Sequence, residues 1–287
     1  MPSIVRIVSV LLLWLLLSTS LATAQTSPAW QQRVRYEMDI RLDAAQHRMR
    51  GRSRIVYYNH SPDTLRHVFF HLYFNAFHPQ SMMAERNRHL PDPDRRVVPK
   101  IWRLGPDEQG FHRITYLAQE DRPLTFRITD TVLKAELDRP LAPGDSTVFE
   151  IRFHSQVPLQ TRRSGRNNAE GIDFSMSQWY PKIAAYDGRG WHPDPYIGRE
   201  FYGVFGTFDV RITLPACYTI GATGVLLNAD EVGHGYDRIN SRGWTRFDPR
   251  EAGLQCTPGD SLTWHFRAEN VHDFAWAADP DYIHEAW

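Results

Sequence analysis

The sequence predicts an all-β fold, a saddle-like antiparallel β-sandwich. Apolar and polar residues alternate along several segments, which is the pattern of strands with one buried face, and tight-turn sequences separate these segments. The chain has 287 residues, of which 42% are hydrophobic and 13% aromatic, enough for a large packed core. This length allows one large β-domain or two smaller ones.

The amino terminus has the three parts of a secretory signal peptide. Arg6 supplies a positive charge, residues 7–17 are apolar but short for a bilayer span, and residues 22–24 read Ala-Thr-Ala, a small-residue cleavage site. We expect a signal peptide at 1–24 and a mature protein that is secreted or periplasmic, with no stable membrane span after cleavage. The alternative is an uncleaved membrane anchor.

The overall charge argues against a nucleic-acid partner. There are 33 basic and 33 acidic residues, so the formal net charge is zero and Lys and Arg are not in excess over Asp and Glu. A protein that binds DNA or RNA usually carries an excess of Lys and Arg. We therefore expect no nucleic acid among the partners.

The first predicted strands lie at residues 36–42 and 49–58. Both alternate between apolar and polar residues, so each has one wet face. Four arginines share the wet face of the second strand, where they form either an anion-binding strip or an ordinary solvated surface. These arginines are Arg48, Arg50, Arg52 and Arg54.

Residues 65–77 are apolar or aromatic at nearly every position, which suits a strand buried on both faces. His67 and His71 within it are four residues apart, the spacing of a helical zinc site. In a strand that spacing is about 13 Å, too far for one ion to bridge. We therefore predict no metal site here.

Residues 78–110 are polar and rich in proline, and we expect them to be an irregular surface excursion. Three further strands are predicted around residues 124–128, 133–137 and 149–153. The sequence Pro-Gly-Asp-Ser occurs twice before a predicted strand, at 143–146 and 258–261, and its Pro-Gly centre favours a type II turn.

Strands with regular alternation are also expected at residues 205–214 and 262–269. The two cysteines, Cys217 and Cys256, each lie close to the start of a predicted strand. An oxidising compartment permits them to form a disulfide, and two free buried thiols are the alternative.

Two aromatic segments are candidates for recognition. In residues 177–182, Gln178 precedes Trp179 and Tyr180, and these side chains either line a surface groove or fill the core with their polar tips bonded. Residues 188–203 are rich in Gly, Pro, Trp and Tyr and form either a binding loop or a loop packed by its own rings.

A family resemblance rests on six segments: residues 59–65, 71–77, 177–182, 201–203, 208–215 and 270–278. Together they resemble the amino-terminal domain of the aminopeptidase N family of zinc metallopeptidases, the gluzincins. In that family the stretch matching Gln178 to Tyr180 runs past the active-site cleft, and a Gln or Glu there helps to hold the free amino terminus of the peptide substrate. The resemblance implies that Gln178 anchors the substrate amine or backbone and that Tyr180, where many members have Glu or Gln, is a second contact.

A gluzincin binds zinc through His-Glu-x-x-His on a helix and a later Glu, and the sequence contains no complete motif of this kind. His284 and Glu285 begin like one, but they follow too soon after the segment that resembles the end of the β-domain. The resemblance thus implies zinc in a longer parent protein and no metal or catalytic residue in this chain.

We therefore predict three parts in the chain: a signal peptide at 1–24, an aminopeptidase N-type β-domain at 25–278, and the start of a missing catalytic domain at 279–287. The resemblance implies that the parent hydrolyses amino-terminal residues from peptides and that this domain forms one wall of the cleft. The alternative is a non-catalytic secreted β-sandwich that binds peptide or carbohydrate through its Trp- and Tyr-rich loop.

Overall fold

A computed structural model describes residues 30–90, 101–198, 202–238 and 245–286. The expected signal peptide, residues 1–24, lies outside the described residues. Residues 31–287 form one compact unit, and everything below concerns its described part. No helix in these ranges is both long and apolar enough to cross a membrane.

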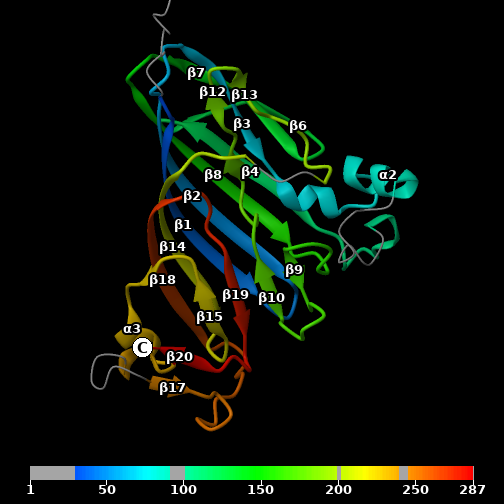
Figure 1. Ribbon diagram of the computed structural model, residues 1–287, viewed down its shortest axis with the longest axis vertical. Coiled ribbons are helices and arrows are strands. Elements are labelled where there is room, and N and C mark those ends of the chain that lie inside the picture. Colours follow the sequence, from blue (N-terminus) through cyan, green and yellow to red (C-terminus); the bar gives the residue numbers. More distant parts are fainter. Residues whose placement is uncertain (1–29, 91–100, 199–201, 239–244, 287) are drawn as a thin grey trace, which may run out of the picture. The chain divides into compact units, whose positions relative to one another are not determined.

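An eight-stranded sheet is the largest element of the unit (Figure 1). Its strand order is β16-β18-β14-β1-β2-β8-β4-β5. Its long central strands alternate between buried and exposed positions, so one face is covered and the other meets solvent. The strands are β1 (Arg33–Asp43), β2 (Arg48–Tyr58), β4 (Phe111–Gln119), β5 (Arg122–Pro123), β8 (Ser146–Gln156), β14 (Gly206–Pro215), β16 (Val225–Leu226) and β18 (Ser261–Val271).

Two four-stranded sheets pack on the covered face. Tyr36 of the large sheet meets the ring of Tyr180 edge-on, and Phe149 meets Phe70 in the same way. One small sheet has the order β11-β3-β7-β6 and the other β15-β19-β10-β9. Their strands are β3 (Leu65–His71), β6 (Phe126–Thr129), β7 (Val132–Leu141), β11 (Lys182–Ile183), β9 (Gly165–Arg166), β10 (Phe174–Met176), β15 (Thr219–Ala222) and β19 (Trp276–Asp279).

The remaining elements are short. There are two antiparallel two-stranded sheets: one pairs β12 (Tyr186–Asp187) with β13 (Gly190–Trp191), and the other pairs β17 (Thr245–Phe247) with β20 (His284–Ala286). The helical elements are η2 (Tyr73–Phe77), α2 (Met82–His89), η3 (Ile101–Arg103), α3 (Ala229–Val232) and η4 (Tyr236–Arg238).

The all-β sandwich is confirmed, with one difference from the expected antiparallel pairing. Strands β1 and β14 run parallel, with Val34 opposite Gly206. Parallel neighbours need a long crossover between them, and here that crossover is most of the domain. Alternation within a strand shows which face is buried, but it carries no information about the direction of the partner strand.

Two local expectations were wrong. The strand expected at 65–77 ends at His71, and the chain continues as the helical turn η2, because an unbroken apolar run fits a buried strand and a buried helical turn equally well. The excursion at 78–110 contains the helix α2, which Ser81 caps at its amino terminus. The Ser81 hydroxyl oxygen accepts a hydrogen bond from the backbone N–H of Ala84 at 3.0 Å.

Both Pro-Gly turns are present as predicted. Gly144 and Gly259 have φ values of 81° and 91°, the left-handed conformation that a type II turn requires at its third residue. Asp145 donates its backbone N–H to Ala142, and Asp260 does the same to Thr257, each at 3.2 Å. Glycine is needed at both positions because a side chain there would be strained.

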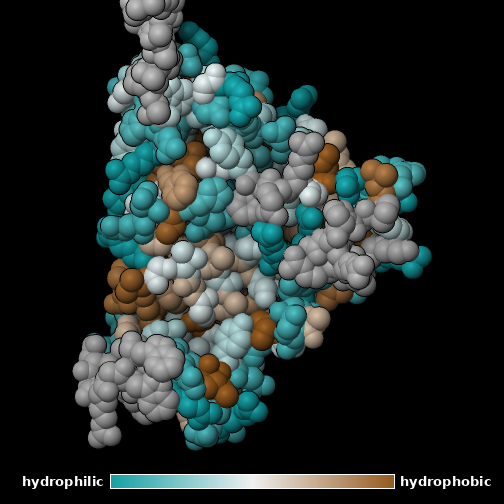
Figure 2. Space-filling view, viewed as in Figure 1, coloured by the Kyte–Doolittle hydropathy of each residue, from teal (hydrophilic) through white to brown (hydrophobic). Residues whose placement is uncertain are grey.

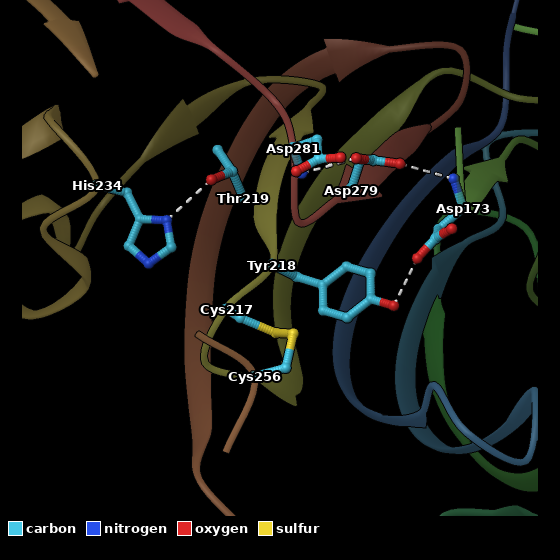
Figure 3. Close-up of a disulfide and its surroundings, with 8 residues drawn as sticks. All are labelled: Asp173, Cys217, Tyr218, Thr219, His234, Cys256, Asp279 and Asp281. Carbon is cyan, nitrogen blue, oxygen red and sulfur yellow. Dashed lines mark hydrogen bonds between the residues drawn. A yellow bond between two sulfur atoms is a disulfide. The ribbon is translucent and has the colours of Figure 1, made fainter. Parts of the chain in front are cut away.

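A disulfide joins Cys217 to Cys256, whose Cα atoms are 4.9 Å apart. Figure 3 shows that it lies beside Tyr218, whose hydroxyl donates to the Asp173 carboxylate at 2.7 Å. The bridge therefore ties the segment before β18 to the start of β15, next to a hydrogen bond that reaches the segment before β10.

Candidate functional site

Gln178 lies in the turn that leads from β10 in one small sheet to β11 in the other. Its φ is 56°, in the left-handed region, and the residue is 3% exposed. This conformation costs a residue with a Cβ about 1 kcal/mol, and glutamine has no special preference for it. Backbone strain of this kind is concentrated at functional sites, so Gln178 is a candidate for one.

The Gln178 side-chain amide is buried, and it differs from its neighbours in having no hydrogen-bond partner among the described residues. Its neighbours are all engaged: the Ser177 hydroxyl donates to the Arg163 carbonyl at 3.1 Å, and the Trp179 indole N–H donates to the Phe274 carbonyl at 2.9 Å. The Ser164 hydroxyl in turn donates to the Ser177 carbonyl. The Gln178 side chain forms no hydrogen bond to any residue in the described ranges.

Tyr180 is buried, and its hydroxyl donates to Asp273 Oδ1 at 2.6 Å. The same oxygen accepts the backbone N–H of Phe274 at 2.9 Å, so the carboxylate is held from two sides. Tyr180 follows Gln178 by two residues, and its hydroxyl points to Asp273. Its role as a substrate contact stays a prediction.

Lys182 is the second partner of Asp273. Its side chain is 2% exposed, and Nζ lies 3.5 Å from Asp273 Oδ2 and 2.8 Å from the His272 carbonyl oxygen, to which it donates. Burial lowers the pKa of Lys182, and Asp273 opposes part of that effect. A buried cation of this kind remains in a fold only where charge and hydrogen bonds compensate for its lost hydration.

Tyr36 of β1 lies beneath the pair. Its hydroxyl accepts the backbone N–H of Ile183 at 3.0 Å, and its ring stacks on Phe208 at 4.8 Å between centroids. Burial raises the pKa values of Tyr36 and Tyr180, so both phenols remain protonated at physiological pH. The large sheet therefore supplies a rigid, uncharged floor for Lys182 and Asp273.

Gly203 explains why the Phe-Tyr-Gly segment at 201–203 ends in glycine. A Cβ at this position would lie 2.8 Å from Lys182 Cε and 2.9 Å from Nζ. Any larger residue would displace the buried ammonium group. Tyr202 and Phe205 on either side of Gly203 are about half exposed and leave apolar rings at the surface.

The outward face of β15-β19-β10-β9 is built from very small residues. Gly221, Ala277 and Ser175 are consecutive partners across β15, β19 and β10, and the next partner, Gly165 of β9, is buried against Gln160. A shallow hollow of about 490 Å³ lies over this face. Figure 2 shows pale and light brown surface over β10, β15 and β19 with little strongly hydrophilic colour. Because these side chains are so small, another domain or protein can approach the backbone of this face closely.

The residues present do not form a zinc site. No three His, Cys, Asp or Glu side chains gather for a metal ion in the described part of the chain. His67 and His71 lie on the strand β3, as the sequence analysis assumed, and His284 lies on the strand β20. No chemical step can therefore be assigned to a metal held by these residues.

In the part that the structure describes, the aromatic loop at 188–203 packs mainly against rings outside the loop, not through its own rings as the alternative to a binding loop had it. Trp191 contacts the rings of Tyr57, Phe69 and Tyr186, and Tyr196 is 7% exposed. The His192 ring lies 2.8 Å from the carboxylate of Asp187. Of the rings described in this loop, only Tyr202 is largely exposed.

Sequence reasoning missed Lys182, His272 and Asp273 as parts of one site. All three lie in segments that carry the family resemblance, but a sequence does not show that a lysine is buried or which carboxylate faces it. The sequence contained one sign of this site, Gly203, because a glycine often marks a position where another group approaches the backbone closely.

The chain matches no protein-family model and no curated protein. Among solved structures it is similar to an M1 zinc metallopeptidase from Deinococcus radiodurans, with 13% identity and a TM-score of 0.44. A mutant of a Deinococcus radiodurans M1 zinc metallopeptidase bound to a Tyr-Ser-Ala substrate gives 15% identity and a TM-score of 0.46. In both cases 86% of this chain is covered, and the chain spans 42% of the other protein.

Proposed function

We propose that the chain is the amino-terminal, cleft-forming domain of a secreted zinc aminopeptidase, and that Gln178 holds the free amine or the backbone of the peptide substrate. The observation that carries this proposal is Gln178 itself. It has a left-handed backbone, an amide without a hydrogen bond among the described residues, and fixed neighbours on both sides.

The residues around Gln178 position it rather than react. Trp179, Tyr180 and Lys182 are anchored to Phe274, Asp273 and the His272 carbonyl, so the turn is held at both ends. A substrate-binding group gains affinity when its conformation is fixed before the ligand arrives. In this proposal the Lys182–Asp273 pair provides that rigidity and touches no substrate.

The zinc ion and the catalytic groups belong, in this proposal, to another part of a longer protein, which would supply a water nucleophile activated by the metal. The flat face of small residues around Ala277 is where that part would pack. Secretion is supported by the signal-like sequence at 1–24 and by the Cys217–Cys256 disulfide, since disulfides persist mainly outside the cytoplasm.

The test uses the full-length protein and peptides with a free amino terminus. Gln178→Ala should raise KM by about tenfold, because one hydrogen bond to a charged amine is lost, and should change kcat little. Gln178→Glu, which keeps the acceptor, is the matched variant and should retain a KM near the wild-type value. An unchanged KM in Gln178→Ala would exclude the anchoring role.

A further inference from the structure

A row of basic side chains crosses the solvent-facing side of the eight-stranded sheet. Arg41 of β1 is directly opposite Arg50 of β2, Arg50 is opposite His154 of β8, and His154 is opposite Arg113 of β4. All four are exposed and lie on the same face. Arg41 and Arg50 are like charges at facing positions, which destabilises a sheet, so folding alone does not account for this pair.

Other arginines on this face have acidic partners. Arg35 lies 2.8 Å from Glu37, and Arg52 lies 3.0 Å from Glu150. In contrast, no ion pair joins Arg41, Arg50 or Arg113 to an acidic group among the described residues. The row therefore has no direct ion-pair partner in the described part of the chain, although Asp39 and Asp43 lie two residues from Arg41 on the same face of β1.

The row crosses a hollow in the sheet surface. Two adjoining cavities of about 820 and 520 Å³ share Arg41 and Arg50 in their walls. The acidic residues in these walls are Asp39, Asp43 and Asp260. We call this region the arginine hollow and define it by the arginines that line it: Arg41, Arg48, Arg50, Arg52, Arg152 and Arg211.

Aromatic rings hold several guanidinium groups in place, and one of these arginines, Arg152, also forms an ion pair with Glu150 at 2.7 Å. Arg48 and Arg113 lie over the Phe111 ring at 5.2 and 5.7 Å, and Arg152 lies over the Tyr116 ring at 4.8 Å. A cation over a ring face is attracted to it and loses conformational freedom but keeps its charge. These arginines are thus oriented before any anion binds.

We propose that the arginine hollow binds an unbranched anionic polysaccharide built of uronic acids. Neighbouring strands are about 4.8 Å apart, so the part of the row that lines the hollow, from Arg41 through Arg50 to His154, spans roughly 10 Å, and Arg113 continues it outside these walls. A uronic acid chain carries one carboxylate on each ring, and guanidinium groups bind carboxylates with two parallel hydrogen bonds. Hydroxyls of Thr213 and Thr263, which hydrogen-bond to each other at 2.8 Å, lie in the same hollow for the sugar hydroxyls.

The geometry disfavours two other anionic partners. Carboxylates on one face of an extended acidic peptide are about 6.7 Å apart, which does not match the spacing of the strands. An anionic bilayer presents a broad, nearly flat surface, and the guanidinium groups here line a concavity. A linear polymer enters such a hollow more readily than a bilayer does.

The test measures binding of polygalacturonate to the full-length protein by titration calorimetry at two NaCl concentrations. We expect binding that weakens with salt and that falls at least about tenfold in Arg41→Gln/Arg50→Gln. The matched control is Arg66→Gln/Arg127→Gln, which removes two exposed charges from the strands β3 and β6 of a small sheet and should bind within about twofold of wild type. Circular dichroism checks folding, and the single variant Arg50→Gln gives the same comparison if the double variant does not fold.

Three results would overturn the proposal. Polygalacturonate could fail to bind the wild-type protein, or both double variants could lose affinity equally, which would indicate attraction by net charge alone. Poly-glutamate or phosphatidylglycerol vesicles could bind as tightly as polygalacturonate, and the hollow would then recognise an acidic peptide or a membrane. None of these measurements depends on peptidase activity.

Discussion

Lys182 and Asp273 form a nearly buried ion pair, with Nζ 3.5 Å from Oδ2 and side chains that are 2% and 16% exposed. The pair joins the turn that holds Gln178 to the segment between β18 and β19. Both partners also have hydrogen bonds to neighbouring groups, so neither charge depends on the other alone.

Removal of one charge from this pair should be far more harmful than removal of both. Asp273→Asn leaves the Lys182 ammonium buried without a counter-charge and should lower the free energy of unfolding by about 3 kcal/mol. The double variant Lys182→Met/Asp273→Asn should recover most of that loss, because no unpaired charge remains. Urea denaturation of the two single variants and the double variant measures the coupling. Additive losses would show that the two charges do not stabilise each other.

The disulfide should contribute mainly by restricting the unfolded chain. Cys217 and Cys256 are 39 residues apart, and closing a loop of that length stabilises the folded state by about 4 kcal/mol in the chain-entropy treatment. Cys217→Ser/Cys256→Ser should lose a large part of this free energy of unfolding. Dithiothreitol should have the same effect on the wild-type protein and no effect on the variant, which provides the control.

Two buried histidines should make the protein less stable in mild acid. Burial lowers the pKa of His71 to about 4 and that of His112 to about 3, against about 6.5 for the unfolded chain. As the pH falls from 6.5 towards 4, the unfolded state takes up protons that the folded state does not. The free energy of unfolding should therefore fall, with each histidine contributing up to about 1.4 kcal/mol per pH unit.

His112→Phe tests this contribution, because a phenyl ring can keep the stacking on Phe74. Urea midpoints measured between pH 4.5 and 6 should show a shallower pH dependence in the variant than in the wild-type protein. The variant also loses the hydrogen bond between His112 and Ser155, which changes its stability at every pH. The test therefore compares the slopes of urea midpoint against pH, not the absolute stabilities. An identical slope would contradict the assignment.

The backbone of Gln178 makes a prediction independent of any substrate. Because its φ is 56°, Gln178→Gly should be about 1 kcal/mol more stable than Gln178→Ala, the reverse of the usual order of these residues in strands and helices. Thermal unfolding of the two variants gives the difference directly. A more stable alanine variant would mean that the turn is not left-handed at this position.

Much of the fold could be predicted because the alternation of apolar and polar residues along a strand shows directly which side chains are buried. Strands β1, β2, β14 and β18 lie where apolar residues recur at every second position, and their buried faces are those that the pattern indicates. The strand β4 was missed, although Ile114 and Leu117 are buried, because a register shift between Ile114 and Tyr116 interrupts the alternation.

The site was harder to predict because it depends on contacts between distant segments. Gln178 and Tyr180 were identified from a family resemblance, and their geometry followed only from the structure. The partner of Tyr180 is Asp273, 93 residues further along the chain, and no local pattern specifies that pairing. The sequence also left undecided whether Cys217 and Cys256 form a disulfide, because the distance between two strand ends is known only from the folded chain.

The parallel pairing of β1 with β14 has a consequence for how the chain folds. One edge of β1 finds its partner only when Gly206 and the residues after it are present, although β1 is among the first segments to be synthesised. Until then its exposed backbone groups can pair with other chains, which is a route to aggregation. Contacts of such long range also slow folding, so the large sheet closes late and a nascent chain depends on protection until β14 arrives.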